Sequence, residues 1–238
     1  MDEYINDLRI NFFKIKKSGF VKSINNSTSS VGITFEHLLG KQEDSSYRPD
    51  YKGIELKCKT TSFLYPITLF SVAFDGPGFN ETKRLADLYG NPDTVYTNLN
   101  GIYCYLNCTK NYTLNDKYLV SLKCDRVNRK LFMVVKDLDN NIIEEESYIT
   151  FDTLKYHLYK KLKYLALVSA EKATIDGSLY FRYNKMEIFN LLEFDKFIDC
   201  LENGIIDCSL ILRIRKSGKD AGEYDYKNIS FMIKPMHL

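Results

Sequence analysis

The sequence predicts an α/β or α+β fold in which helices flank a mixed β-sheet. Apolar residues make up 45% of the 238 residues, which is enough for a packed interior. Segments with a helical spacing of apolar residues are interspersed along the chain with segments that alternate like strands. The length suits one large domain or two lobes that share a core. We find no internal repeat, low-complexity tract or clean linker, so we expect a single domain (residues 1–238).

Two helices are expected before the first strand. Apolar residues recur at spacings of three and four across residues 2–17, which predicts an amphipathic helix, and Gly19 follows its end. Similar spacing predicts a helix over 31–39 that Gly40 ends. A loop then leads into a strand at 50–59, so a helix directly precedes this strand.

The rest of the chain mixes strands and helices. A dense apolar run predicts a buried strand at 66–74, and Asn80 can cap a helix that runs to Leu88. Alternation predicts further strands, and helical spacing predicts two further helices. The strands are expected at 100–107, 117–124, 130–136, 164–174, 179–183, 205–215 and 229–234, and the helices at 151–163 and within 188–202.

Composition disfavours several functional classes. No apolar run approaches the roughly 18–20 residues that a membrane span needs, and the acidic start of the chain lacks the features of a signal peptide. The six cysteines form no CxxC pair, so a zinc ribbon is disfavoured and free thiols are expected. We therefore expect a cytoplasmic protein with no membrane partner.

Charge is unevenly distributed, although the formal net charge is only +2. Acidic residues crowd 137–146, while basic residues collect at 155–163 and at 213–219. Electrostatic attraction is local, because salt screens it beyond about 10 Å. A near-neutral chain can therefore bind a polyanion such as DNA through one basic wall.

The segment PDYKGIELK at 49–57 carries the strongest chemical signal. In a strand, Glu55 and Lys57 point to one face while the intervening apolar residues point to the other. Asp50 precedes the strand at a turn, where its carboxylate can converge on Glu55. Two carboxylates suit a hard cation such as Mg²⁺, and the ammonium beside them suits metal-assisted phosphodiester hydrolysis.

Simpler interpretations of these patterns remain open. The string Asp-x4-Glu-x-Lys is short and occurs often by chance. Glu55 and Lys57 could form a structural salt bridge at a sheet edge, which would leave Asp50 as a turn residue. The basic segments at 155–163 and 213–219 could be solvated surface.

A longer set of motifs resembles the MvaI/BcnI restriction endonucleases and their mismatch-repair relative MutH, which belong to the PD-(D/E)XK nucleases. GITFEHLLG at 32–40 is followed by the PD and GIELK segments at this family's spacing. The resemblance is closest to the MvaI branch and spans most of the chain, although residues 95–150 diverge. Further matches lie at 68–70, 89–93, 161–171 and 217–222.

The resemblance implies a PD-(D/E)XK fold with a DNA cleft between two lobes. The catalytic lobe would centre on about 30–95, and the recognition lobe would include about 155–234. The resemblance further implies a catalytic set and a Mg²⁺ site. Asp50, Glu55 and the backbone carbonyl of Leu56 would ligate Mg²⁺, Lys57 would act on the attacking water and the developing charge, and Glu36 would position a water molecule.

The DNA-reading residues should lie mainly in the C-terminal third. Arginine reads guanine bidentately, whereas lysine more often holds phosphate. The chain lacks the histidines and the arginine that its relatives carry near residues 224–233, so we expect a different target sequence. The candidates are Lys59, Arg213, Arg215, Lys216, Lys219, Asp225, Tyr226 and Lys227.

The first functional hypothesis is a Mg²⁺-dependent type II restriction endonuclease. It would cut double-stranded DNA at a short site as a monomer that nicks the strands in succession, and a cognate DNA methyltransferase would be its genetic partner. A MutH-like repair nickase is the nearest alternative. A DNA-binding protein with an inactive nuclease site is the third possibility.

Overall fold

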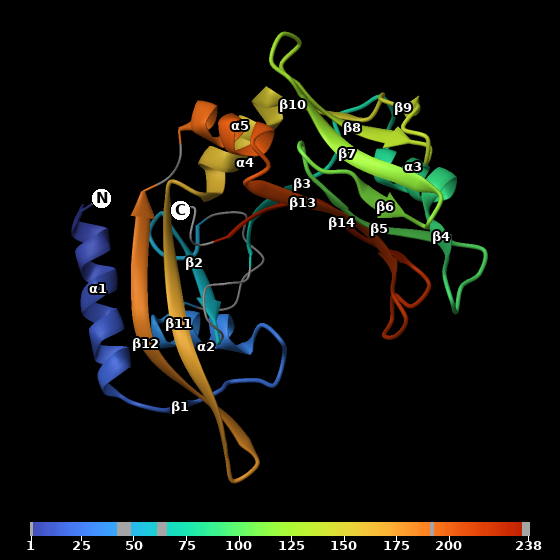
Figure 1. Cartoon of the computed structure of the whole chain (residues 1–238). Coiled ribbons are helices and arrows are strands. Elements are labelled where there is room, and N and C mark those ends of the chain that lie inside the picture. The colour runs from blue at the N-terminus through green and yellow to red at the C-terminus, as the bar shows by residue number, and fades with distance from the viewer. Residues whose placement is uncertain (1, 42–48, 61–65, 191–192, 235–238) are drawn as a thin grey trace.

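The computed structural model describes residues 2–41, 49–60, 66–190 and 193–234 (Figure 1). Within these ranges the helices are α1 (Asp2–Lys17), α2 (Ser30–Leu38), α3 (Glu81–Tyr89), α4 (Phe151–Lys161) and α5 (Phe194–Glu202). The strands are β1 (Val21–Lys22), β2 (Ile54–Lys59), β3 (Ile67–Val72), β4 (Asn91–Pro92), β5 (Asn100–Leu106), β6 (Tyr112–Leu114), β7 (Tyr118–Asp125), β8 (Lys130–Lys136), β9 (Ile142–Glu144), β10 (Tyr148–Thr150), β11 (Tyr164–Ile175), β12 (Ser178–Asn190), β13 (Ile206–Ile214) and β14 (Tyr224–Ile233).

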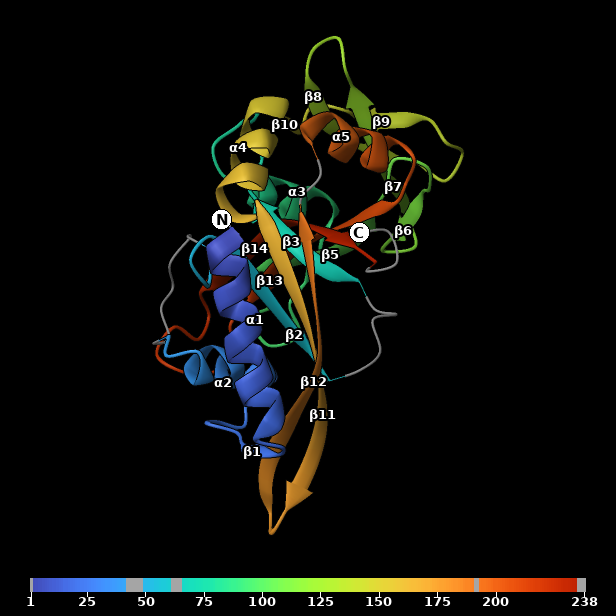
Figure 2. The same cartoon turned by 90° about the vertical axis from the view of Figure 1, so that its left-hand side faces the viewer.

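The first lobe is a mixed sheet covered by two helices. Its strand order is β1-β12-β11-β2, and β2 is an edge strand that pairs in parallel with β11. The α1 helix packs against one face of this sheet (Figure 2), burying Leu8, Phe12 and Ile15. The α2 helix adds Val31 and Phe35 to the same small core.

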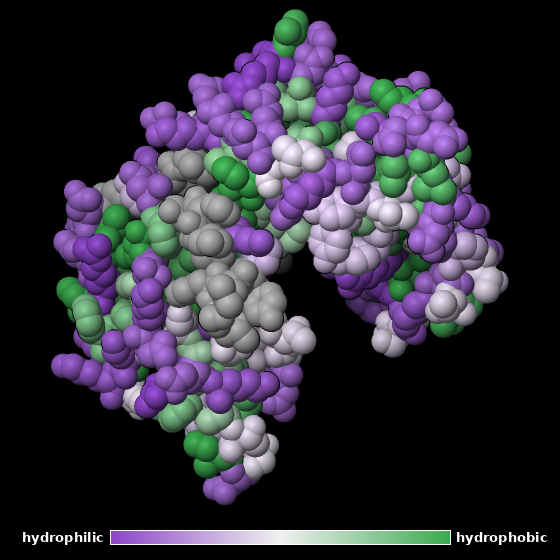
Figure 3. Space-filling view, viewed as in Figure 1, coloured by the Kyte–Doolittle hydropathy of each residue, from purple (hydrophilic) through white to green (hydrophobic). Residues whose placement is uncertain are grey.

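The second lobe is built from two further sheets. One has the order β3-β14-β13-β5-β4, and the other has the order β10-β8-β7-β6 with β9 paired to β8. Apolar side chains of both sheets, together with α3, α4 and α5, form one large core. The opposite face of the β3-β14-β13-β5-β4 sheet borders the hollow that separates the lobes (Figures 1 and 3).

The β11 strand joins the two lobes. Ala166 and Val168 belong to the small core of the first lobe, whereas Leu165 and Leu167 belong to the large core. A strand that is buried on both faces in this way reads as a continuous apolar run, as β11 does. The edge strand β2 is therefore held at the junction of the lobes.

The predicted fold class is confirmed, and the differences concern particular elements. The β12 strand runs to Asn190, through the start of the range expected to contain a helix, and α5 begins only at Phe194. The strand expected at 229–234 begins at Tyr224. The short strands β1, β4, β6, β9 and β10 have two or three residues each, too few for alternation to predict them.

Sheet membership cuts across the residue ranges expected for the two lobes. The β3 strand and α3 fall within 30–95 but pair and pack in the second lobe. The β11 and β12 strands fall within 155–234 but build the first sheet. In the described part of the chain, no helix has the length and apolar character needed to cross a membrane.

Candidate active site

A tight turn precedes the edge strand β2. Tyr51 and Ile54 exchange two backbone hydrogen bonds, of 2.9 and 2.8 Å. Between them, Lys52 and Gly53 both have positive φ angles, of 47° and 91°. Two central residues with positive φ are typical of a type I′ turn, in which glycine meets no steric penalty. This turn folds the residue before it, Asp50, back along β2.

The Asp50 carboxylate is thereby fastened to the open edge of β2. Its Oδ2 accepts a hydrogen bond of 3.0 Å from the Leu56 backbone N–H. Because the N–H and C=O of one residue in a strand point to the same side, the Leu56 carbonyl also faces this open edge. Asp50 and the candidate carbonyl ligand thus share one side of the strand.

Glu55 and Lys57 lie on the face of β2 that is turned toward the lobe junction. They pair in register with Leu165 and Leu167 of β11, which enter the large core. Lys57 Nζ donates to Glu55 Oε1 over 2.6 Å, and the Glu55 side chain is only 1% exposed. A buried carboxylate is costly unless it is paired, and Lys57 supplies that pairing.

Glu36 completes the acidic cluster from the end of α2. Lys41 Nζ lies 3.1 Å from Glu36 Oε2 and 2.9 Å from Asp50 Oδ1, so it bridges the two carboxylates. Burial raises the pKa of Glu36, and the negative charges of Asp50 and Glu55 add to that rise against the opposing effect of Lys41. All three carboxylates therefore share one electrostatic environment.

The site opens into a pocket of about 240 Å³ between β2, β3 and α4. Lys57 lines this pocket together with Ser71 of β3 and with His157 and Lys160 of α4. The His157 ring stacks on Phe70, and burial lowers the pKa of this histidine. Ammonium, imidazole and hydroxyl groups beside the candidate catalytic lysine suit an anion such as a phosphate.

The carboxylates fit a divalent cation by their chemistry. In the described part of the chain, no three or more His, Cys, Asp or Glu side chains form a ready-made metal cluster. The Lys41 ammonium nevertheless contacts both Glu36 and Asp50, so one cation can reach oxygens from two elements. Oxygen ligands of this kind are those that Mg²⁺ and Ca²⁺ prefer.

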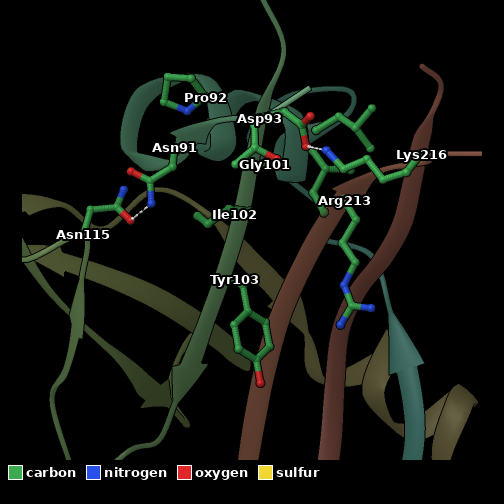
Figure 4. Close-up of a pocket in the computed structure, with 12 residues that line it drawn as sticks. Asn91, Pro92, Asp93, Gly101, Ile102, Tyr103, Asn115, Arg213 and Lys216 are labelled. Atoms are coloured by element: carbon green, nitrogen blue, oxygen red, sulfur yellow. Dashed lines mark hydrogen bonds and ion pairs between the residues drawn. The ribbon is translucent and has the colours of Figure 1, made fainter. Parts of the chain in front are cut away.

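Arg213 lies on the exposed face of the β3-β14-β13-β5-β4 sheet, which we call the recognition sheet because it carries several of the predicted DNA-binding residues. Together with Tyr103 of β5 it lines an open hollow of about 540 Å³ (Figure 4). Tyr103 also hydrogen-bonds to the hydroxyl of Tyr105 over 2.8 Å, and both tyrosines are exposed. Within the described residues, the Arg213 guanidinium makes no hydrogen bond or ion pair.

Most of the other predicted DNA-binding side chains are engaged by neighbours. At the β13–β14 hairpin, Arg215 pairs with Asp220 over 2.6 Å and Lys216 pairs with Asp93 (Figure 4). Lys219 is exposed in the same turn. The remaining pairs are Lys227–Asp225 at 3.1 Å, Tyr226 Oη accepting from Asn80 at 2.8 Å, and Lys59 donating to the Pro66 carbonyl at 2.7 Å.

Sequence reasoning misses Lys41, His157 and the tyrosine pair on β5. The sequence places Lys41 in a loop, although its position directly after Gly40 and five residues after Glu36 is a usable signal. A helix that ends in a glycine motif returns the chain toward its own last turn. The other residues depend on how β5 and α4 pack, which their local patterns do not reveal.

Comparisons with known proteins identify the family of this chain. The sequence profile described as the MvaI/BcnI restriction endonuclease family matches residues 10–238. The chain belongs to this family. It is a type II restriction endonuclease, a hydrolase that acts on DNA. The resemblance deduced from the sequence is thus confirmed. No curated protein sequence matches the chain.

Two solved structures are similar over nearly the whole chain. A complex of restriction endonuclease MvaI with its cognate DNA substrate has 27% sequence identity and a TM-score of 0.89, with 99% of this chain and 95% of that chain covered. MvaI in the absence of DNA has 26% identity and a TM-score of 0.63, with 98% and 93% covered. Both share the fold of this chain.

Proposed function

We propose that this chain cuts both strands of DNA at a short specific site in a Mg²⁺-dependent reaction. The observation that carries the proposal is the junction cluster, defined as Glu36, Asp50, Glu55 and Lys57 with the Leu56 carbonyl. It combines carboxylate and carbonyl oxygens with one ammonium at the place where the lobes meet. This is the donor set that metal-assisted phosphodiester hydrolysis requires.

Each member of the cluster has a distinct task. Asp50, Glu55 and the Leu56 carbonyl would hold the metal ion, and Glu36 would position a water molecule. When bound, Mg²⁺ polarises the phosphate and lowers the pKa of water. Lys57 orients the attacking water and stabilises the negative charge that develops on the phosphoryl oxygens.

The basic groups around the cluster position the DNA backbone. His157 and Lys160 border the pocket that Lys57 enters, so they hold a phosphate next to the scissile one. On the recognition sheet, Arg213 reads a guanine edge because its guanidinium is available for a bidentate contact. The edge of this reading surface is formed by Arg215, Lys216, Lys219, Asp225, Tyr226 and Lys227. Lys59 contacts the DNA backbone.

The enzyme acts as a monomer in the cytosol and nicks the strands in succession. One junction cluster per chain can cut only one strand at a time, so a monomer must reorient or rebind to finish the break. A DNA methyltransferase that protects the host's own sites is the expected genetic partner. Its gene beside that of the endonuclease would support a restriction-modification system.

Cleavage of phage DNA and supercoiled plasmid in Mg²⁺ tests this proposal. Discrete fragments, with open-circular plasmid appearing before linear plasmid, are the expected result. Nicking confined to a repair-type site would favour the MutH-like alternative, and binding without cleavage would favour an inactive site. Asp50→Ala should abolish cutting while the variant still binds DNA in Ca²⁺. Normal cutting by this variant would refute the site assignment.

A further inference from the structure

The ammonium group of Lys41 occupies the space between two carboxylates of the junction cluster. Its Nζ lies 2.9 Å from Asp50 Oδ1 and 3.1 Å from Glu36 Oε2. The three side chains are 18%, 19% and 25% exposed for Lys41, Asp50 and Glu36. Ion pairs this sheltered from water are stronger than ordinary surface salt bridges.

The backbone around Gly40 fixes Lys41 in this place. Gly40 has a φ of +81° and donates to the His37 carbonyl over 2.9 Å, while the Lys41 N–H donates to the Glu36 carbonyl over 3.0 Å. These two bonds form the Schellman motif that ends many helices. The motif turns the chain back on α2, so the side chain of Lys41 returns to the carboxylate five residues before it.

A divalent cation at the cluster would compete with this ammonium. Mg²⁺ binds carboxylate oxygens at about 2.1 Å, so a cation on the oxygens that Lys41 contacts would lie within about 5 Å of its Nζ. Two positive charges this close repel each other strongly in a partly buried site. The same oxygens therefore cannot favourably hold the ammonium and the metal together.

We propose that Lys41 is the counter-ion of the metal-free site and that it leaves Glu36 and Asp50 when a divalent cation binds. This inference rests on the proposed metal-dependent function. Lys41 keeps the carboxylates together before metal binds, and it weakens metal binding by the protein alone. An incoming DNA phosphate adds negative charge near the cluster, which shifts the competition toward the metal.

Calorimetric titration of the DNA-free, full-length protein with Ca²⁺ tests the proposal. Lys41→Met keeps the aliphatic stem but removes the charge, and we expect it to bind Ca²⁺ about tenfold more tightly, or more, than the wild type. Lys41→Arg should bind like the wild type. Lys52→Met is the matched control, because Lys52 pairs with Asp7 of α1 and not with the junction cluster.

Thermal unfolding supplies a second readout. In EDTA, Lys41→Met should melt below the wild type, and saturating Ca²⁺ should raise its melting temperature by more than it raises that of the wild type. If the variant does not fold, side-chain NMR of ¹³C-labelled lysine in the wild type replaces it. There the Lys41 signal should shift when Ca²⁺ is added, whereas the Lys52 signal should not.

The outcomes separate this inference from the proposed function. If the wild type binds Ca²⁺ and Lys41→Met binds it equally or more weakly, the counter-ion role is wrong while the metal site stands. An unmoved Lys41 signal in a Ca²⁺-saturated protein leads to the same conclusion. If neither protein binds Ca²⁺, Mg²⁺ or Mn²⁺, with or without DNA, both the inference and the metal-dependent function fail.

Discussion

The available guanidinium of Arg213 distinguishes it from the other basic residues of the recognition sheet. Arg215 and Lys216 form ion pairs with Asp220 and Asp93, and a DNA contact would require them to give up these pairs. Arg213 has no such partner in the described part of the chain and lies beside exposed Tyr103. Arg213 is therefore the residue that we propose for direct base reading.

Arg213→Ala should weaken binding to the specific site by about 1–3 kcal/mol, the value of one bidentate arginine–guanine contact. Arg213→Lys should lose most of the same discrimination, because an ammonium keeps the charge without the forked donors. Fluorescence anisotropy with cognate and scrambled duplexes in Ca²⁺ measures the difference.

Arg215→Ala is the control for this prediction. It removes the same side chain from a residue that pairs with Asp220, so cognate and scrambled duplexes should lose similar, smaller amounts of affinity. Equal losses on both duplexes for Arg213→Ala would make Arg213 a backbone contact instead of a base reader.

The sequence indicates the chemistry of individual residues more fully than it indicates which other residues they contact. Period-two alternation places Glu55 and Lys57 on one face of a strand, and the 2.6 Å ion pair agrees with that. The bridge by Lys41 between Glu36 and Asp50 could not be foreseen, because it depends on where the end of α2 stands relative to the turn before β2. Local patterns do not contain that distance.

At the scale of elements, the backbone conformation at Gly40, where α2 ends, places Lys41 against the junction cluster. A Cβ atom added at Gly40 would meet no heavy atom within 4 Å, so Gly40→Ala costs only the strain of a left-handed backbone conformation. That strain should lower the unfolding free energy by about 1 kcal/mol. We further expect tighter Ca²⁺ binding than in the wild type, because the strained motif holds Lys41 less firmly.

Gly19→Ala provides a matched control for the Gly40 variant. Gly19 follows α1, has a φ of +69°, and a Cβ added there would also meet no heavy atom within 4 Å. It should lose similar stability in urea unfolding with no change in calorimetric Ca²⁺ affinity. Equal Ca²⁺ affinities for the two variants would show that the Schellman motif does not influence metal binding.

A buried ionic network fastens α3 to the segment around β9. Arg84 pairs with both Glu81 and Glu144, and Tyr89 donates to Glu144 over 2.8 Å. Replacing Arg84 leaves the buried carboxylates of Glu81 and Glu144 without this positively charged partner. Arg84→Met should therefore lower the unfolding free energy by about 3 kcal/mol, the low end for a buried pair, because a third of Arg84 is exposed. Urea unfolding measures this loss.

Arg129→Met is the control, since Arg129 pairs with Asp152 on the surface. Loss of an exposed pair should cost at most about 1 kcal/mol. If Arg84→Met loses no more unfolding free energy than Arg129→Met, the network adds little to the stability of the lobe.

Acid should weaken the same network. Burial opposes ionisation of Glu81, but hydrogen bonds from Arg84 and Ser147 outweigh burial and hold its pKa below the usual value. A carboxylate with a lowered folded-state pKa stabilises the protein above its unfolded pKa of about 4.5 and loses that contribution as pH falls through the folded value. Unfolding free energy should thus decline below about pH 4.5, and less steeply in Glu81→Gln. Equal slopes would exclude Glu81 as a source of the decline.

Long elements with clear periodicity are predictable from the sequence, whereas boundaries set by pairing are not. Helix α1 appears over the expected residues because its apolar stripe alone specifies it. The β12 strand instead continues to Asn190, since pairing with β11 along its length outweighs the helical spacing near residue 188. Tertiary hydrogen bonding decides that boundary.

For the whole molecule, the structure is more similar to MvaI in complex with DNA than to MvaI in the absence of DNA. The two MvaI structures have nearly the same identity to this chain, 27% and 26%, yet the TM-scores are 0.89 for the DNA complex and 0.63 for the DNA-free form. Sequence divergence is the same in both comparisons, so the scores differ because the two MvaI structures differ in shape. This feature could not be predicted from the sequence, because local patterns do not contain the relative position of the lobes.

We therefore expect the free enzyme to populate a wider range of lobe separations than its DNA complex. Spin labels on Lys14 of α1 and Val127 of the β7–β8 turn, both exposed, report on opposite lobes. Unnatural amino acids should carry the labels, because six native thiols would compete. Cognate DNA with Ca²⁺ should narrow the distance distribution toward the arrangement of the lobes in Figure 1.

Two controls make this last prediction specific. Labels on Lys14 and Arg182 lie within the first lobe, so their distance should not change when DNA binds. A scrambled duplex should narrow the interlobe distribution less than cognate DNA, because closure is driven by differential contacts with the recognition sheet. An interlobe distribution that is already narrow without DNA would mean that the lobes are rigid and that specificity arises from the reading surface alone.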